Sequence, residues 1–330
     1  MIGEILNTAF ITGLIGAAMR MATPIIFATL GEIINERAGI LNLGIEGIML
    51  MGAMTGFLVS ITTGLLWIGV LAAALVGMIL SLLMAFLTVY LGLSQHVSGL
   101  GITLFSTGLA MFIYRIRFGS PLVPPIVEPF TQVTIPLLSK IPVIGPSLFD
   151  QYVLTYIAVL LIPIISIILY KTHIGLKIRT VGENPLAADN VGVNVYLTRT
   201  LCLVTGGALI GIGGSFLTLA HQNMFLIDVI GGRGWVSIAM VIFGNWDPLK
   251  GALGAFIFGF LDGLQLRLQV LGIKAPFDIF LMIPYLMTII ALVGVSRKAA
   301  VPACLLKPFH RVYPNIPGEY LVSDSCFNDT

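Results

Sequence analysis

The chain has 330 residues, of which 57% are hydrophobic and only 10% are charged, and its mean hydropathy is +1.03. A soluble domain carries roughly 25% charged residues, so this composition excludes an ordinary soluble protein and predicts one that spans the lipid bilayer. The net charge of +2 is too small to indicate a nucleic-acid partner.

The predicted elements are apolar segments separated by polar connections. A spanning helix needs about 20 apolar residues, so the chain has room for roughly eight to ten of them. We therefore expect an all-α fold, a polytopic bundle of membrane helices in one domain. The expected spans, in chain order, are residues 5–30, 45–61, 65–91, 100–114, 152–170, 200–220, 251–270 and 279–295. Residues 31–44, which are rich in glycine and charge, are expected to interrupt the helix after the first span.

Two segments differ from both the ordinary spans and the short loops. Residues 118–150 contain seven prolines, and that density predicts an extramembrane loop without helix. Residues 235–243 are apolar and lie between Gly234 and Gly244. As a helix they would rise about 14 Å, roughly half of the hydrocarbon core. They are therefore predicted to form a half-helix or broken segment, which a membrane tolerates only where it is buried in protein or lines a cavity.

Basic residues in short loops predict the orientation, because such loops face the cytoplasm. Residues 171–199 hold four Lys and Arg residues and residues 297–311 hold another four, whereas the loop 118–150 holds a single Lys. The first two are expected in the cytoplasm and the proline-rich loop outside. The expected domains are a transmembrane domain at 1–298 and a cytoplasmic tail at 299–330.

The polar segment 171–199 also contains a predicted short helix. Asn184 can cap free backbone N–H groups, and Pro185 fits the first helical position. Glu183 adds negative charge where the helix dipole is positive. The helix would then make fewer than two turns before Gly192, a natural stop. This pattern favours a helix lying outside the bilayer; an ordinary polar connection is the alternative.

Polar groups at membrane depth are candidates for function. Glu46 lies near the start of the second span. Asp262, Gln265 and Gln269 are spaced i, i+3 and i+7, and therefore share one face of a later span. Such a stripe suits hydrogen bonding to a polyhydroxylated solute; the alternative is a polar contact that holds helices together. With Asn42, these residues form the predicted substrate path.

Motifs of an enzyme are absent from the sequence. It contains no H-E-x-x-H, no G-x-S-x-G and no G-x-x-x-x-G-K-[ST] motif. The four histidines lie in separate loops and in the tail, so no metal site is expected. If the protein uses ATP, another chain must bind it.

Several blocks resemble one family in order along nearly all of residues 5–310. Residues 31–53, GEIINERAGILNLGIEGIMLMGA, look like the signature of permease subunits in bacterial ABC importers of the branched-chain amino acid and simple-sugar permease type. Residues 175–195, GLKIRTVGENPLAADNVGVNV, are similar to the segment of that family that docks on the ATPase. Residues 232–269 match a third block, and residues 302–309 resemble the family's short C-terminal motif. The first two blocks look closest to the nucleoside-uptake branch.

The resemblance implies a permease subunit in the cell membrane that binds no cofactor itself. Its implied partners are ATPase subunits that use ATP, a second and often different permease, and an extracellular binding protein, usually a lipoprotein. The expected solute is a nucleoside, with a purine nucleoside such as guanosine foremost. The alternatives are a simple sugar or, from another class, an ion-coupled secondary transporter.

The resemblance also implies which residues contact the ATPase: Glu183, Asn184, Pro185, Leu186, Ala187, Ala188, Asp189, Val191 and Gly192. Ala187, Ala188 and Val191 would give the short helix a small, mostly apolar surface for a partner's cleft. Glu183 and Asp189 would meet basic residues at the rim of that cleft.

Overall fold

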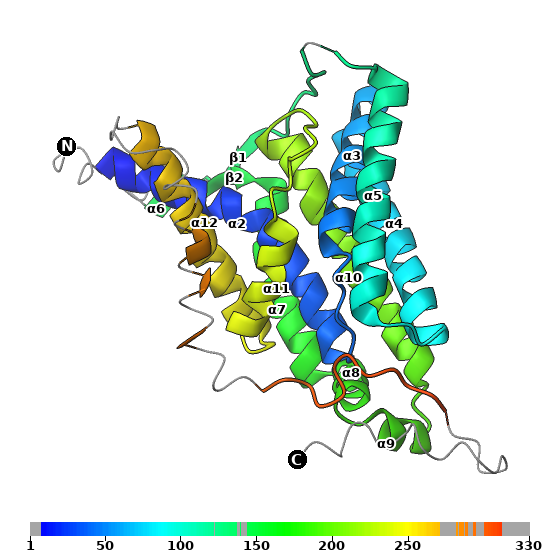
Figure 1. The fold of residues 1–330 in the computed structure, drawn as a ribbon. Helices are drawn as coiled ribbons and strands as arrows, with labels where there is room; N and C mark the ends of the chain where they lie inside the picture. The colour runs from blue at the N-terminus through cyan, green and yellow to red at the C-terminus, as the bar shows by residue number, and fades with distance from the viewer. Residues whose placement is uncertain are drawn as a thin grey trace.

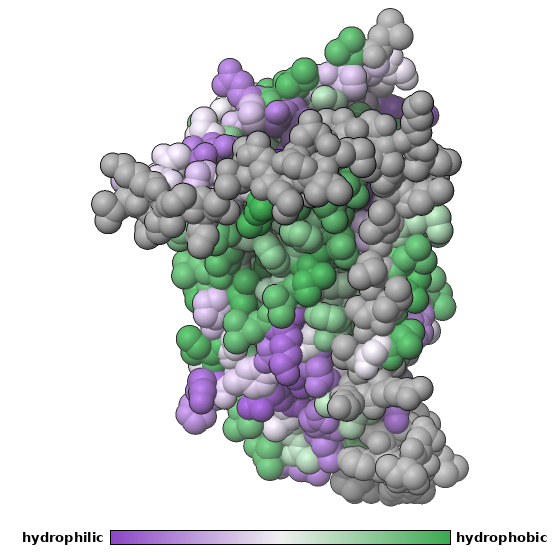
Figure 2. Space-filling view, turned by 90° about the vertical axis from the view of Figure 1, so that its left-hand side faces the viewer, coloured by the Kyte–Doolittle hydropathy of each residue, from purple (hydrophilic) through white to green (hydrophobic). Residues whose placement is uncertain are grey.

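The computed structural model describes residues 8–121, 123–136, 139, 144–270, 282, 284–286, 288–289, 293–294 and 300–311. Within this part of the chain, seven helices are long and apolar enough to cross a membrane. Figure 2 shows hydrophobic residues gathered across the middle of one face, with much of the hydrophilic surface above and below them. The predicted all-α membrane bundle is confirmed. Most of the span expected at 279–295 lies outside the described residues.

The spanning elements are α2 (Thr8–Arg37), α3 (Ile45–Thr63), α4 (Leu66–Ala85) with the π-helical turn η1 (Phe86–Tyr90), α5 (Gln95–Phe118), α7 (Val153–Lys171), α10 (Val195–Phe216) with the π-helical turn η3 (Leu217–His221), and α12 (Pro248–Val270). The shorter elements are β1 (Gln132–Thr134), α6 (Ile144–Leu148), β2 (Asp150–Tyr152), α8 (His173–Glu183), α9 (Pro185–Asn190) and α11 (Arg233–Phe243). The half-helix predicted at residues 235–243 is α11.

Helix α10 lies at the centre of the bundle, against α2, α3 and α4 (Figure 1). Its glycines allow this close packing. A Cβ atom added at Gly211 would overlap the carbonyl oxygen of Ala73, and one added at Gly214 would overlap that of Met49. Small residues at such positions let helix backbones approach and gain van der Waals contact, which is the main attraction between helices in lipid.

The predicted interruption after the first span is wrong. Helix α2 continues through Gly31 to Arg37, and only residues 38–44 form the connection to α3. The polar residues at this end of α2 are buried with partners: the Asn35 Nδ2 atom donates to Glu32 at 2.9 Å, and the Trp246 indole donates to Glu36 at 2.6 Å. Because each of these side chains forms at least one hydrogen bond inside the protein, its polarity does not end the helix.

The proline-rich loop is not wholly free of helix, contrary to the expectation. Its described part contains the short helix α6 and an antiparallel pair in which β1 meets β2, with Gln132 opposite Tyr152. Pro146 lies in the first turn of α6, where a missing N–H removes no intrahelical hydrogen bond. The strands β1 and β2 lie towards the end of the bundle opposite α8 and α9 (Figure 1).

This separation allows a direct test of orientation. In a chain whose three native cysteines are replaced, cysteine at Ala187 should react with a membrane-impermeant maleimide only after the membrane is opened. Cysteine at Ser139, in the proline-rich loop, should react in intact cells. Both positions retain exposed surface, so failure to react reports the side of the membrane. Labelling of Ala187→Cys in intact cells would contradict the predicted orientation.

Candidate functional site

The N-terminus of the half-helix α11 is held by Glu46 of α3. The backbone N–H of Gly232 donates to Glu46 Oε1 at 2.9 Å, and that of Gly234 donates to Oε2 at 2.8 Å. The first N–H groups of a helix have no intrahelical partner, and the helix dipole is positive there. A carboxylate at this place therefore fixes where α11 begins within the bundle.

Two glycines allow Glu46 to bind the start of α11. Gly232 has a φ of 78°, in the left-handed region that favours glycine. A Cβ added at Gly234 would lie 2.6 Å from Glu46 Oε2 and 2.7 Å from Glu46 Cα. Any other side chain at Gly234 would push α11 away from α3, so the glycine predicted as a helix boundary also sets the contact with Glu46.

Arg233 joins the start of α11 to α12. Its Nη2 atom lies 3.2 Å from Asp262 Oδ2, and its Nη1 atom donates to the Ile230 carbonyl at 3.0 Å. The hydroxyl of Tyr285 donates to the Gly231 carbonyl at 3.0 Å. The side chains of Arg233 and Asp262 keep 17% and 15% exposure. This part of the bundle therefore brings together a guanidinium, a carboxylate and a phenol, groups that can donate and accept hydrogen bonds.

Arg233 was missed by sequence reasoning. The signal for it was present, because an arginine directly beside a predicted broken segment is an ionisable group near membrane depth. Its partner Asp262 was identified, but the sequence offers nothing that links two residues 29 positions apart on different helices.

One of the five predicted path residues, Asn42, is held by backbone hydrogen bonds. Asn42 lies in the connection between α2 and α3, where its N–H donates to Glu32 Oε1 at 2.7 Å. Its Oδ1 atom accepts from the Gly44 N–H at 3.0 Å. Asn42 is fully buried, so these bonds shape the connection that leads to α3 and Glu46.

Gln265 and Gln269 follow Asp262 along α12, as their spacing predicted. Gln265 is only 3% exposed, and its Oε1 atom is buried without a hydrogen-bond partner among the described residues. The Nε2 atom of Gln269 is likewise buried without a hydrogen-bond partner among the described residues. A buried unpaired amide group costs about 1–3 kcal/mol, so each can gain from a polar solute or a water that reaches it.

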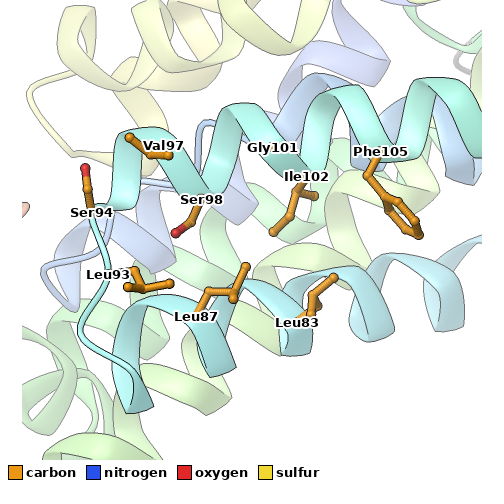
Figure 3. Close-up of a pocket in the computed structure, with 9 residues that line it drawn as sticks. All are labelled: Leu83, Leu87, Leu93, Ser94, Val97, Ser98, Gly101, Ile102 and Phe105. Atoms are coloured by element: carbon orange, nitrogen blue, oxygen red, sulfur yellow. The ribbon is translucent and has the colours of Figure 1, made fainter.

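A groove of about 560 Å³ lies between α4 and α5, but it is poorly suited to a polar solute (Figure 3). Its walls are apolar except for two serines, and the lining residues are Leu83, Leu87, Leu93, Ser94, Val97, Ser98, Gly101, Ile102 and Phe105. Small-molecule sites need several placed polar groups for orientation and specificity. The groove therefore offers little to recognise hydroxyls or a nucleobase.

Among the described residues, no three His, Cys, Asp and Glu side chains lie close enough together to hold a metal ion.

Helix α9, at the other candidate site, begins and ends where the sequence predicted. The Asn184 Oδ1 atom accepts from the Ala187 N–H at 2.9 Å, and Pro185 takes the first helical position. Gly192 follows with a φ of 87°. Neighbouring α8 and α10 have caps of the same kind, from Thr172 and Asn194 respectively.

The expected surface of α9 is only partly correct. Val191 is 80% exposed and Ala187 is also exposed, which places one small apolar face in solvent. Ala188 is 2% exposed and packs with Phe309 inside the protein. Residues i and i+4 share a helix face, whereas the residue after i is turned away from it. The prediction that Ala188 belongs to the exposed surface is therefore wrong.

Both acidic residues of this region have partners in the chain itself. Glu183 Oε2 accepts from the Ala303 N–H at 3.2 Å, and Asp189 Oδ2 accepts from Arg311 Nε at 2.8 Å. The hydrogen bond from Arg311 lowers the pKa of Asp189 below its usual value. The pair therefore stabilises the fold above the unfolded-state pKa and is lost only as the pH falls through the lowered value. It persists at physiological pH.

Residues 14–292 match the family described as branched-chain amino acid transport system / permease component. The chain is 36% identical to the guanosine ABC transporter permease protein of Bacillus subtilis, over 88% of this chain and 93% of the relative. It is 36% identical to a nucleoside ABC transporter permease protein of Lactococcus lactis, over 85% and 91%. It is 37% identical, over 92% and 99%, to a Haloferax volcanii protein provisionally named a glucose ABC transporter permease protein. No solved structure matches the chain.

Proposed function

The chain belongs to the branched-chain amino acid transport system / permease component family, and from this premise we propose that it carries a purine nucleoside such as guanosine into the cell. As an ABC permease it is a multi-pass protein of the cell membrane and not an enzyme; a partner ATPase uses the ATP. The observation that carries the nucleoside proposal is 36% identity to two nucleoside permeases over most of the chain.

A simple sugar is the second candidate solute, favoured by the 37% identity to the Haloferax volcanii protein. Uptake of radiolabelled guanosine, measured with and without this gene, separates the two. Excess unlabelled nucleosides should compete, whereas glucose, galactose and ribose should not. Uptake of labelled sugar that depends on this gene and resists competition by nucleosides would instead establish the sugar.

The solute path is proposed to pass the start of α11. A nucleoside has ribose hydroxyls and a base with both donors and acceptors. Arg233 and Asp262 offer both kinds of group with part of their surface exposed, and Gln265 adds an acceptor that has no partner among the described residues. Glu46 and Asn42 belong to the path indirectly, because they fix α11 and the connection before α3.

Gln265→Leu should lower uptake by about tenfold, the effect of one hydrogen bond in a dry site. Leucine keeps a similar volume, so the bundle should assemble normally. Initial uptake rates, corrected for the amount of complex in the membrane, provide the measurement. Loss of the whole complex from the membrane would instead show that Gln265 serves helix packing.

The proposed partners follow from the same family. An ATPase and a solute-binding protein act with permeases of this family, and we take the binding protein to be an extracellular lipoprotein. The second permease is proposed to differ from this chain. In support, the same Lactococcus lactis strain has another nucleoside ABC transporter permease protein, 30% identical over 32% of this chain.

Helix α9 is proposed to seat in a cleft of the ATPase. Its exposed face carries Ala187, Asn190 and Val191, and small side chains let a partner's groove approach closely. Closing of the ATPase would then push α9 towards the bundle.

A further inference from the structure

Residues 300–311, called here the C-terminal strap, run beside α8 and α9 (Figure 1). Hydrogen bonds fix the strap to the end of α8. The Cys304 N–H donates to the Gly182 carbonyl at 3.0 Å, and the Ala303 N–H donates to the Glu183 carboxylate at 3.2 Å. The strap is therefore attached at the residues that directly precede α9.

The strap also packs against the buried side of α9. Phe309 is 6% exposed and packs with Val181, Ala188 and Val195 in a separate small apolar cluster. The Tyr196 hydroxyl donates to the Phe309 carbonyl at 3.3 Å. An isolated helix of six residues is unstable in water, so α9 depends on such packing for its rigidity.

The last described residue of the strap, Arg311, forms an ion pair with α9. Arg311 donates through both Nε and Nη2 to the two carboxylate oxygens of Asp189. This two-point contact fixes the orientation as well as the position of the pair. Asp189 lies in the final turn of α9, so the strap binds both the end of α8, just before the short helix, and the last turn of α9.

A buried arginine links the strap to the transport site. Arg199 of α10 is 1% exposed; its Nε donates to the Ala38 carbonyl at 3.2 Å and its Nη1 donates to the Lys307 carbonyl at 3.2 Å. Ala38 begins the connection from α2 to α3, and α3 carries Glu46, which holds the start of α11. Contacts thus connect α9 through the strap to Ala38, and the chain itself continues from Ala38 to Glu46, which binds the start of the half-helix.

We propose that the C-terminal strap is a working part of the coupling element, with Arg311 and Arg199 as its positioning residues. It holds α9 as a rigid block and conveys displacement of α9 through Arg199 to the α2–α3 connection. The inference rests on the proposed docking of α9 only for the source of that displacement. Without the strap, a push on α9 would deform this short helix instead of moving the bundle.

The test is a charge exchange between Asp189 and Arg311 in the complete transporter. Arg311→Asp and Asp189→Arg each place like charges together, and the double variant restores an opposite pair. Each single variant should increase hydrogen exchange in the backbone of α9 and lower solute uptake per ATP hydrolysed about fivefold, since a partly exposed pair is a modest contact. The double variant should restore most of the protection of α9 from hydrogen exchange and most of the uptake per ATP hydrolysed. Arg199→Met should lower uptake per ATP without loosening α9 to the same extent, and Arg199→Lys should recover part of the loss.

Two results would overturn the proposal: a double variant that recovers neither measurement, or a loosened α9 with unchanged uptake per ATP. Hydrogen exchange measures how firmly the strap holds α9, whether or not an ATPase binds this helix. The docking proposal fails separately, if Val191→Arg leaves ATPase binding and uptake intact.

Discussion

Replacing Val191 by arginine is expected to lower nucleoside uptake by at least about thirtyfold, the effect of disrupting the centre of an interface. Val191, which directly follows the last residue of α9, is 80% exposed on the proposed docking face. A long charged side chain there would collide with the proposed cleft of the ATPase and could not be desolvated within it. The measurements are uptake by the reconstituted transporter and retention of the ATPase during purification.

Two variants control for other causes of this loss. Val191→Thr keeps the shape without adding charge and should retain most of the uptake. Ala188→Arg should also stop uptake, but by expelling Phe309 from its cluster, so hydrogen exchange should rise in the strap and α9. Val191→Arg should leave that exchange unchanged. Full solute-stimulated ATP hydrolysis and uptake in Val191→Arg would show that α9 does not couple the ATPase to transport.

Glu46→Ala is the second substitution expected to have a large effect. It leaves the N–H groups of Gly232 and Gly234 without their acceptor, at a cost of about 1–3 kcal/mol each. The start of α11 would then shift, taking Arg233 away from Asp262. Uptake should fall by at least about thirtyfold, because the displaced group belongs to the proposed solute path.

Glu46→Gln separates charge from shape, since it keeps one acceptor oxygen and should show an intermediate loss. Ser237→Ala is the matched control: the Ser237 hydroxyl donates only within α11, to the Arg233 carbonyl at 2.8 Å, so its loss should leave uptake nearly normal. Normal uptake in Glu46→Ala, at equal amounts of assembled transporter, would show that this anchor is dispensable.

The elements that could be predicted from sequence are those set by local rules. The membrane spans are predicted by the length of the apolar runs, and α11 is predicted by a run of nine mostly apolar residues between two glycines. Helix α9 was correctly bounded because its cap, first-turn proline and terminal glycine lie within nine residues of one another. Each of these signals acts over a few residues and needs no knowledge of the rest of the chain.

The errors arise where contacts between residues that are far apart in the sequence determine the structure. Glu36 remains inside helix α2 because Trp246, 210 residues later, donates to it. Glu46 stays a predicted path residue, but the sequence did not reveal that its carboxylate binds N–H groups 186 and 188 residues away. Asp189 was expected to meet a basic residue of a partner, yet Arg311 of the same chain pairs with it. Polarity in the sequence marks these residues as important without identifying their partners.

The central claim is that this chain imports a nucleoside by using the ATP hydrolysed on a partner. The most direct measurement is accumulation of labelled guanosine in proteoliposomes that contain the permeases and ATPase, with the binding protein on the side from which solute enters. The account predicts accumulation against a gradient with ATP, none with a non-hydrolysable analogue, and no dependence on a proton or sodium gradient. Accumulation driven by an ion gradient without ATP, or of glucose but not guanosine, would contradict it.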